Sequence, residues 1–587
     1  MCGFGVELRR DAPPDRAALE RMRDSLAPRG PDGEGVWLDG SAGMVHRRLA
    51  IIDLSELGAQ PMRDDELGLA VVFNGCIYNH RELRAELERL GHSFSSTSDT
   101  EVVLRGWREW GEGLLDRLAG MFAFALLETE SGRCALVRDR LGIKPLYLAD
   151  LPGGGLRAAS TLPALVAAGG VDTSVDPVAL HHYLSWHSVV PAPRTILAGV
   201  RKLPPATVLL VEPDGTRRER EYWNPPHERA EERSPEEWRD ALLDALRVAV
   251  RRRMVSDVPV GVLLSGGLDS SLIVALLAEQ GQHGLATFSI GFPDAGGREG
   301  NEFRYSDLIA QEFGTDHHQI RAGTDELVEA LPSAIAAMSE PMVSHDCVAF
   351  WLLSQAVARE RKVVQSGQGA DEVLGGYSWY PPMLDAPDSG LATYAAEFFD
   401  RDDAQLREFT GAAAPDDVSR AFAREWFERP GAETPVDRAL RIDTRIMLVD
   451  DPVKRVDNMT MAHGLEARTP FLDHELVELA ARIPPELKLA DGGKGILKAA
   501  ARGVVPDAVI DREKGYFPVP ALSHLEEPVL GMVRDALTSS AARDRGLFRP
   551  EVVEPMLADP NAHRTNLDGS TLWQLGLLEL WLQTQLG

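Results

Sequence analysis

The sequence predicts a two-domain protein of mixed α/β and α+β structure, on the basis of three patterns. The first 210 or so residues contain several strand-like apolar runs separated by few helices. From residue 235 onward strand and helix patterns alternate, which is typical of a parallel sheet covered on both faces. Beyond about residue 385 the pattern is mainly helical. We therefore expect domains at 1–212 and 235–587.

The N-terminal domain is predicted from short β-branched and aromatic runs. The expected strands are 69–73, 121–127, 134–137 and 207–211. A helical pattern at 80–90 ends at Gly91, a residue that commonly stops helices. Residues 213–234 are polar, contain prolines and show no periodicity, so we interpret them as a linker.

The second domain is predicted from regular alternation, and no internal repeat is evident. The expected strands are 258–264, 286–292, 318–321 and 362–366, with helices at 236–253, 270–280 and 303–313. Ligands of such sheets bind at the carboxyl ends of the strands.

The sequence SGGLDS at residues 265–270 lies at one of these carboxyl ends, between a buried strand and a helix. Glycines let the backbone approach a ligand, and free N–H groups at a helix start favour an anion. The motif lacks the lysine of a Walker A loop. It resembles the pyrophosphate loop of enzymes that split ATP into AMP and pyrophosphate to activate an acyl group.

Length and composition exclude several classes of protein. A chain of 587 residues is too long to fold around a single hydrophobic core. The formal charge of −28 argues against a nucleic-acid partner, because a protein that binds phosphates needs a basic face. The four cysteines show no zinc-ligand spacing. No apolar run approaches the ~20 residues of a membrane span, and the charged N-terminal segment is unlike a signal peptide. We expect a cytoplasmic protein.

Cys2 would become the first residue on removal of Met1, and its own α-amine, titrating near pH 8, could then activate the thiol. A series of further motifs follows: CG at 2–3, RGPD at 29–32, RLAIID at 48–53, FNG at 73–75, YN at 78–79 and SD at 98–99. This series resembles the glutaminase domain of class II glutamine amidotransferases. The resemblance implies an Ntn-type αββα sandwich.

The same resemblance implies a role for each residue. Cys2 would attack the glutamine amide, and Asn74 with the Gly75 N–H would stabilise the oxyanion. Arg48 would bind the substrate carboxylate and Asp99 its ammonium group. One position departs from the family, since Cys76 stands where a glutamate is usual and a carboxylate near the substrate amine is lost.

Motifs of the second half extend the resemblance. They are SGQGADE at 366–372, GGY at 375–377, DNMTMA at 457–462, LEARTPFLD at 465–473 and KGILK at 494–498. With the glutaminase motifs, they resemble the asparagine synthetase B family over essentially the whole chain. This implies an adenine nucleotide α-hydrolase-like domain that forms an acyl-adenylate from ATP and a carboxylate. Ammonia from the glutaminase would cross an internal tunnel and displace AMP.

The family resemblance also assigns the ATP and Mg²⁺ sites. The expected nucleotide-binding residues are Leu263, Ser265, Gly266, Gly267, Asp269, Ser270, Ser289, Gly291, Ser366 and Gly367. Asp269 and Asp371 would hold Mg²⁺, and Lys494 would neutralise charge developing on the phosphates.

The acceptor carboxylate is the open question. Gln368 stands where asparagine synthetases have an acidic residue. The segments 340–350, 378–382 and 514–520 resemble the branch that makes N-acetylglutaminylglutamine amide, which is our favoured acceptor assignment. Aspartate is the alternative acceptor. The intact glutaminase residues argue against a β-lactam-forming relative, which would not need external ammonia. The presence of two complete sites argues against a non-catalytic homologue. The acidic charge argues against an enzyme that acts on tRNA. The partners expected are small molecules, with neither nucleic acid nor a membrane. A homodimer is the assembly considered.

Overall fold

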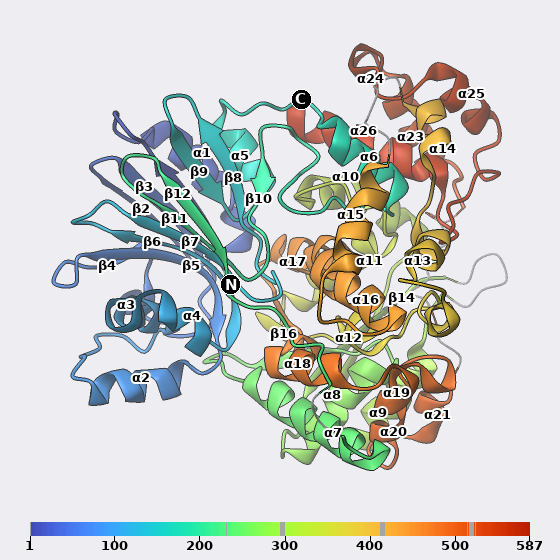
Figure 1. The fold of residues 1–587 in the computed structure, drawn as a ribbon, viewed down its shortest axis with the longest axis horizontal. Helices are drawn as coiled ribbons and strands as arrows, with labels where there is room; N and C mark the ends of the chain where they lie inside the picture. Colours follow the sequence, from blue (N-terminus) through green and yellow to red (C-terminus); the bar gives the residue numbers. More distant parts are fainter. Residues whose placement is uncertain are drawn as a thin grey trace.

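The computed structural model describes residues 2–229, 232–293, 300–410, 417–512, 515, 522 and 524–587. Its N-terminal part contains two six-stranded antiparallel sheets (Figure 1). The first has the order β10 (Arg201–Lys202), β8 (Tyr147–Leu151), β9 (Gly155–Ala159), β1 (Gly3–Leu8), β3 (Ala42–Arg48), β2 (Gly33–Asp39). The second has the order β12 (Arg217–Glu221), β11 (Thr207–Val211), β7 (Cys134–Arg138), β6 (Gly120–Glu128), β5 (Leu69–Ile77), β4 (Met62–Asp64).

Helices cover the outer faces of both sheets and produce the predicted αββα sandwich. Helices α1 (Arg16–Ser25) and α5 (Leu162–Ala168) pack on the first sheet, and α2 (His80–Arg89) and α3 (Asp99–Trp110) lie on the side of the second. Strand β5 shows why the layers form, because its side chains alternate. Ala70 and Val72 pack between the sheets, whereas Val71 and Phe73 pack against the helices.

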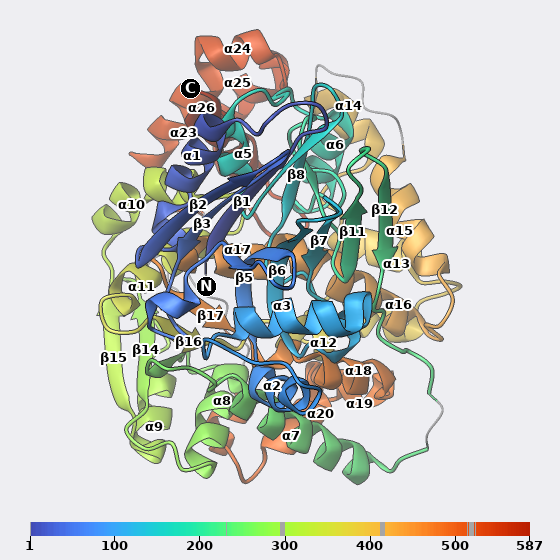
Figure 2. The same ribbon diagram turned by 90° about the vertical axis from the view of Figure 1, so that its left-hand side faces the viewer.

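The C-terminal part is built on a five-stranded sheet whose neighbouring strands are all parallel, as predicted (Figure 2). Its order is β15 (Asp316–Arg321), β14 (Ala286–Gly291), β13 (Val260–Leu263), β16 (Val363–Gln365), β17 (Glu466–Arg468). Strand β17 was not predicted, since a three-residue strand with two charged side chains has no apolar pattern.

Helices surround this sheet and form the helical C-terminal part. Around the sheet lie α7 (Pro235–Arg252), α8 (Leu268–Glu279), α9 (Phe303–Phe313), α10 (Thr324–Ala337), α11 (Asp346–Val357) and α12 (Ala370–Leu374). Further helices are α4 (Leu114–Arg117), α6 (Pro177–Ser185), α13 (Leu391–Phe398), α14 (Asp403–Phe409), α15 (Val418–Glu428), α16 (Pro435–Ile442), α17 (Lys454–Met461), α18 (His474–Arg482), α19 (Pro485–Leu489), α20 (Gly495–Ala501), α21 (Asp507–Ile510), α23 (Val529–Thr538), α24 (Ser540–Arg545), α25 (Pro550–Ala558) and α26 (Thr571–Leu586).

Local sequence accounts for the elements that position the second site. Ser234 caps α7 in a capping box with Glu237, and Pro235 occupies the first helical position. Helix α8 is apolar on most of its surface and is correspondingly buried through most of its length.

The segment 213–234, interpreted from the sequence as a linker, contains one strand in its first part. Residues 217–221 form β12, which pairs with β11 across a turn in which Gly215 has a φ of +86°. The segment reads RRERE, and an edge strand that exposes charged side chains lacks the apolar alternation on which strand prediction depends. Within the described ranges, no helix is both long and apolar enough to cross a bilayer.

Candidate active sites

Cys2 lies where the two N-terminal sheets meet. It directly precedes β1, and Gly3 is opposite Arg47 on β3, which brings Cys2 beside Arg48. The Cys2 backbone N–H donates to Oδ1 of Asn74, on β5 of the other sheet, at 3.1 Å. One hydrogen bond thus fixes the nitrogen of Cys2 to the asparagine that the sequence analysis singled out.

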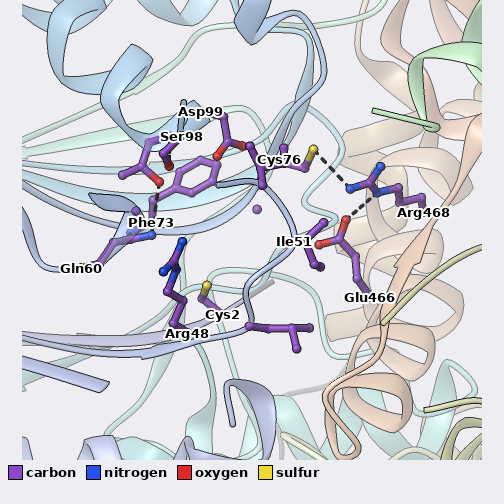
Figure 3. Close-up of a pocket in the computed structure, with 15 residues that line it drawn as sticks. Cys2, Arg48, Ile51, Gln60, Phe73, Cys76, Ser98, Asp99, Glu466 and Arg468 are labelled. Carbon is purple, nitrogen blue, oxygen red and sulfur yellow. Dashed lines mark hydrogen bonds and ion pairs between the residues drawn. The ribbon is translucent and has the colours of Figure 1, made fainter. Parts of the chain in front are cut away.

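A pocket opens beside Cys2 and collects most of the predicted glutaminase residues (Figure 3). Arg48, Gly75 and Asp99 line it together with Cys2. It is also lined by Leu49, Ile51, Ile52, Gly58, Gln60, Phe73, Cys76, Ser98, Thr100, Glu466 and Arg468. Three strand ends and the start of α3 therefore converge on the cysteine.

The amide of Asn74 presents a donor with no partner. Its Oδ1 accepts from Cys2, but its Nδ2 is buried and makes no hydrogen bond within the described chain. Buried side-chain donors are normally satisfied. An orphan N–H beside a nucleophile is the arrangement that stabilises an oxyanion when one forms.

Arg48 and Asp99 are held by the main chain around the pocket. Arg48 donates to the carbonyl oxygen of Ser55 at 2.7 Å and to that of Asp53. Asp99 is the first residue of α3, and its Oδ2 accepts from the Ile77 N–H at 2.9 Å. Burial raises the pKa of the Asp99 carboxyl, although nearby His80 opposes the shift. The pocket thus offers a guanidinium group that can bind an anionic group and a carboxyl group that can bind a cationic group.

Cys2 is buried, with 6% of the residue exposed. Burial raises the pKa of its thiol, and nearby positive charge, including the Arg48 guanidinium, offsets only part of the effect. The thiol is therefore protonated near neutral pH, so that nucleophilic attack requires a base to remove its proton.

The lining residues that sequence reasoning did not place in this pocket include Gln60, Glu466 and Arg468. Gln60 links β5 to α3, because its Oε1 accepts from the Phe73 N–H and its Nε2 donates to Thr100. No sequence signal marks it. Glu466 and Arg468 belong to the motif at 465–473, but their position in the glutaminase pocket depends on how the two domains pack.

The SGGLDS loop follows β13 and begins α8. Gly266 has a φ of +78°, and a side chain there would meet the backbone N of Ser306 at 2.7 Å. The Ser265 N–H donates to Ser270 Oγ, and the Gly267 N–H to Ser265 Oγ, at 3.2 and 3.3 Å. The loop is therefore a tight turn at the carboxyl end of the parallel sheet, as expected.

Lys494 joins the two predicted Mg²⁺-binding carboxylates. Its Nζ lies 2.8 Å from Asp269 and 2.9 Å from Asp371. Although burial lowers the pKa of this lysine, the two carboxylates reverse the effect and raise it above the usual value. The structure thus gathers these three residues in one largely buried cluster.

The other predicted nucleotide residues lie at neighbouring strand ends. Gly367 follows β16, and a side chain there would lie 3.0 Å from the Asp269 Cβ and 3.1 Å from the Ser270 nitrogen. The backbone N–H of Ser366 donates to the carbonyl of Arg468 at 2.8 Å. Leu263 is the last residue of β13, and Gly291 the last of β14. Ser289 also lies on β14, and its hydroxyl is hydrogen-bonded to His317 Nε2 at 3.1 Å.

The sequence also gave no indication of an ion pair that holds the SGGLDS loop. Arg512 Nη1 donates to the carbonyl oxygen of Gly266 at 3.0 Å, and its guanidinium pairs with Glu302. The same guanidinium lies 4.3 Å from the ring centroid of Tyr305. These residues come from three separate segments, so only the fold brings them together.

Two of the three segments that resemble the dipeptide-amide branch, 340–350 and 378–382, lie among the described residues. Trp379 and Tyr380 are buried and donate to the Asp443 carboxylate at 3.0 and 2.7 Å, so they belong to the core. In the segment 340–350, Arg455 contacts Ser344 and lies 3.7 Å from Asp346. Apart from Gly515, the segment 514–520 lies outside the described residues.

Comparison with known proteins identifies two families. Residues 241–583 match the family described as asparagine synthase, and residues 1–223 match the glutamine amidotransferase domain family. The glutamine-hydrolysing asparagine synthetase 1 of Bacillus subtilis is 30% identical, over 99% of this chain and 96% of its own length. A putative asparagine synthetase of Mycobacterium tuberculosis is 33% identical, over 86% and 84% of the two chains. Asparagine synthetase B of Escherichia coli is 30% identical, over 88% and 82%.

Proposed function

Because this chain belongs to the asparagine synthase family, we propose that it is a glutamine-hydrolysing ligase that amidates an acyl-adenylated carboxylate and releases AMP and pyrophosphate. The observation that carries the proposal is that one chain holds both a cysteine pocket with an orphan amide donor and a lysine–carboxylate cluster beside a phosphate-type loop. The proposed division is 1–212 for glutaminase, 213–234 for the connection and 235–587 for synthesis. We place the enzyme in the cytoplasm, with a homodimer as the assembly to test.

In the glutaminase half, the Cys2 sulfur attacks the amide carbon of glutamine. The α-amine freed by loss of Met1 takes the thiol proton, which the buried thiol does not release unaided near pH 7. Asn74 Nδ2 and the Gly75 N–H donate to the oxygen that becomes negative. Arg48 and Asp99 hold the α-carboxylate and α-ammonium, and the departing ammonia is the product that the second site consumes.

In the synthetase half, Ser265, Gly266, Gly267 and Ser270 cradle the phosphates of ATP, and the ends of β13, β14 and β16 contact its adenosine. Mg²⁺ fits the two carboxylates, because this cation commonly takes one or two carboxylates together with substrate phosphates. Among the described residues no cluster of three or more metal-ligand side chains exists, so a dedicated protein cage is not the alternative. Asp269 and Asp371 would hold the ion, which supplies positive charge to the phosphates, and Lys494 donates to the same region.

For the acceptor we propose N-acetylglutaminylglutamine. The support is Gln368, which cannot take up a proton where asparagine synthetases place an acidic residue, and the local likeness of the segment 340–350. Aspartate is the second candidate, favoured by the names of the relatives and by the burial of Trp379 and Tyr380 in the core.

Pyrophosphate release by the purified protein with ATP, Mg²⁺ and glutamine tests both levels of the proposal. Release with the dipeptide and not with aspartate supports the proposed acceptor. Release with aspartate, together with asparagine detected by mass spectrometry, identifies the second candidate. If neither acceptor supports release and glutamine is not hydrolysed, the proposed activity itself is wrong.

A further inference from the structure

The glutamine pocket has a wall that comes from the other domain. Glu466 and Arg468, both on strand β17 of the parallel sheet, line the pocket of Cys2 (Figure 3). Both side chains are almost completely buried, at 1% and 0% exposure. They are more than 360 residues away in sequence from Asp99, the nearest glutaminase residue assigned to the substrate. The pocket is therefore complete only when the two domains are packed together.

Arg468 is fixed on every side. Its Nη1 donates to the carbonyl oxygens of Arg253 and Val255 at 2.8 and 2.6 Å. Its Nε donates to Glu466 Oε1 at 2.5 Å, and its Nη2 approaches Cys76 Sγ at 3.6 Å. Arg468 thus acts as a rigid support that orients the Glu466 carboxylate and fills the space beside Cys76.

Glu466 brings a negative charge into the pocket. Burial alone would raise its pKa, but the Arg468 guanidinium, the N-terminal ammonium group and Lys144 together outweigh burial, and the pKa is lowered to about 2. The charge of Glu466 acts on the thiols of Cys2 and Cys76 and on the carboxyl of Asp99. An ionised carboxylate can accept about four hydrogen bonds, so Glu466 can bind more than one donor at the same time.

We propose, building on the proposed glutaminase activity, that Glu466 is a glutamine-binding residue that the synthetase domain supplies, and that its carboxylate faces the α-ammonium group of the substrate. The pocket then holds Arg48 for the substrate carboxylate, and Asp99 and Glu466 for its ammonium. Glu466 replaces the carboxylate that Cys76 cannot provide. Arg468 is a positioning residue that keeps Glu466 ionised and aimed.

The test compares glutamine with glutaramate, the monoamide of glutaric acid, which carries the same amide and carboxylate but no ammonium group. In the full-length protein, Glu466→Gln is expected to raise the KM for glutamine about tenfold, with kcat changed less than threefold. The KM for glutaramate is expected to stay within twofold. Asp99→Asn serves as the positive control, and Glu478→Gln, on nearby α18, as a matched acidic control.

Equal increases of KM for the two substrates, or no increase for glutamine, would overturn the role of Glu466. If Glu466→Gln does not fold, Glu466→Asp, which keeps the charge, is measured instead. Its KM for glutamine should rise about threefold with the KM for glutaramate unchanged, and equal changes again refute the role. Failure of the wild-type protein to hydrolyse glutamine is a separate result, because it contradicts the proposed activity and not merely this assignment.

Discussion

Replacement of Lys494 by Met removes the ammonium group that lies between the carboxylates of Asp269 and Asp371. Its Nζ lies 2.8 and 2.9 Å from the two carboxylates. At an effective dielectric constant of about 20, each contact is worth about 6 kcal/mol of attraction before desolvation is subtracted. The side chains are only 11–23% exposed, so breaking the cluster should cost about 3–5 kcal/mol of unfolding free energy.

We expect Lys494→Met to lower pyrophosphate release at least 100-fold, equivalent to about 2.7 kcal/mol of transition-state stabilisation. Glutamine hydrolysis should remain within threefold of wild type, because Lys494 contacts none of the residues around Cys2. The melting temperature should fall by several degrees. Added Mg²⁺ should raise it more in the variant than in the wild type, since a divalent cation can replace the lost ammonium between two like charges.

Lys498→Met is the matched control. Lys498 lies one turn further along α20, and its Nζ donates only to the Asp491 carbonyl oxygen among the hydrogen bonds of the described residues. It should retain synthesis, glutaminase activity and the wild-type response to Mg²⁺. The reasoning is refuted if Lys494→Met keeps more than a tenth of wild-type pyrophosphate release, or if its glutaminase activity falls in parallel.

Three further predictions concern the glutaminase side. Asn74→Ala should lower kcat for glutamine hydrolysis about 10²–10³-fold, because it removes a hydrogen-bond donor to the oxyanion. Pyrophosphate release with free ammonia should survive. An equal loss of both activities would contradict the role of Asn74. Glutaminase kcat/KM should rise as the pH is raised from below about 8 to above about 8, because the α-amine then becomes neutral and can deprotonate the buried thiol. A flat profile from about pH 6.5 to 8.5 would exclude the α-amine as the base. Glu466 has its pKa lowered from 4.5 to about 2, so its contribution to stability is complete above pH 4.5 and is lost as the pH falls toward 2; chemical denaturation of Glu466→Gln should show a weaker decline between pH 5 and 3 than wild type.

Much of the architecture followed from periodicity. Strand 207–211 and helix 303–313 begin and end at the predicted residues, because both have clear apolar patterns and marked boundaries. The SGGLDS loop was placed correctly at a strand end, since a glycine turn between a buried strand and a helix has few other solutions. Strands β12 and β17 were not predicted, because both are edge strands rich in charged residues. They pair through backbone hydrogen bonds and lack the apolar alternation on which strand prediction depends.

The sites were predictable to the extent that single motifs contain them. Cys2, Arg48 and Asp99 lie in motifs that a known family shares, and the structure brings them to one pocket. Glu466 was visible only as part of a synthetase motif. Its position beside Cys2 depends on the packing of two domains, which sequence periodicity does not encode.

The two sites share a structural element, and this bears on how they can work together. Strand β17 pairs in parallel with β16, with Glu466 opposite Val363 and Arg468 opposite Gln365. Its side chains line the pocket beside Cys2, while the carbonyl of Arg468 accepts from the Ser366 N–H at the start of the second loop. A second connection lies on α17, where Asp457 binds the Arg29 guanidinium at 2.8 Å and Arg29 Nε donates to the Cys2 carbonyl oxygen at 3.2 Å. Displacement of either element would therefore move groups beside Cys2 directly.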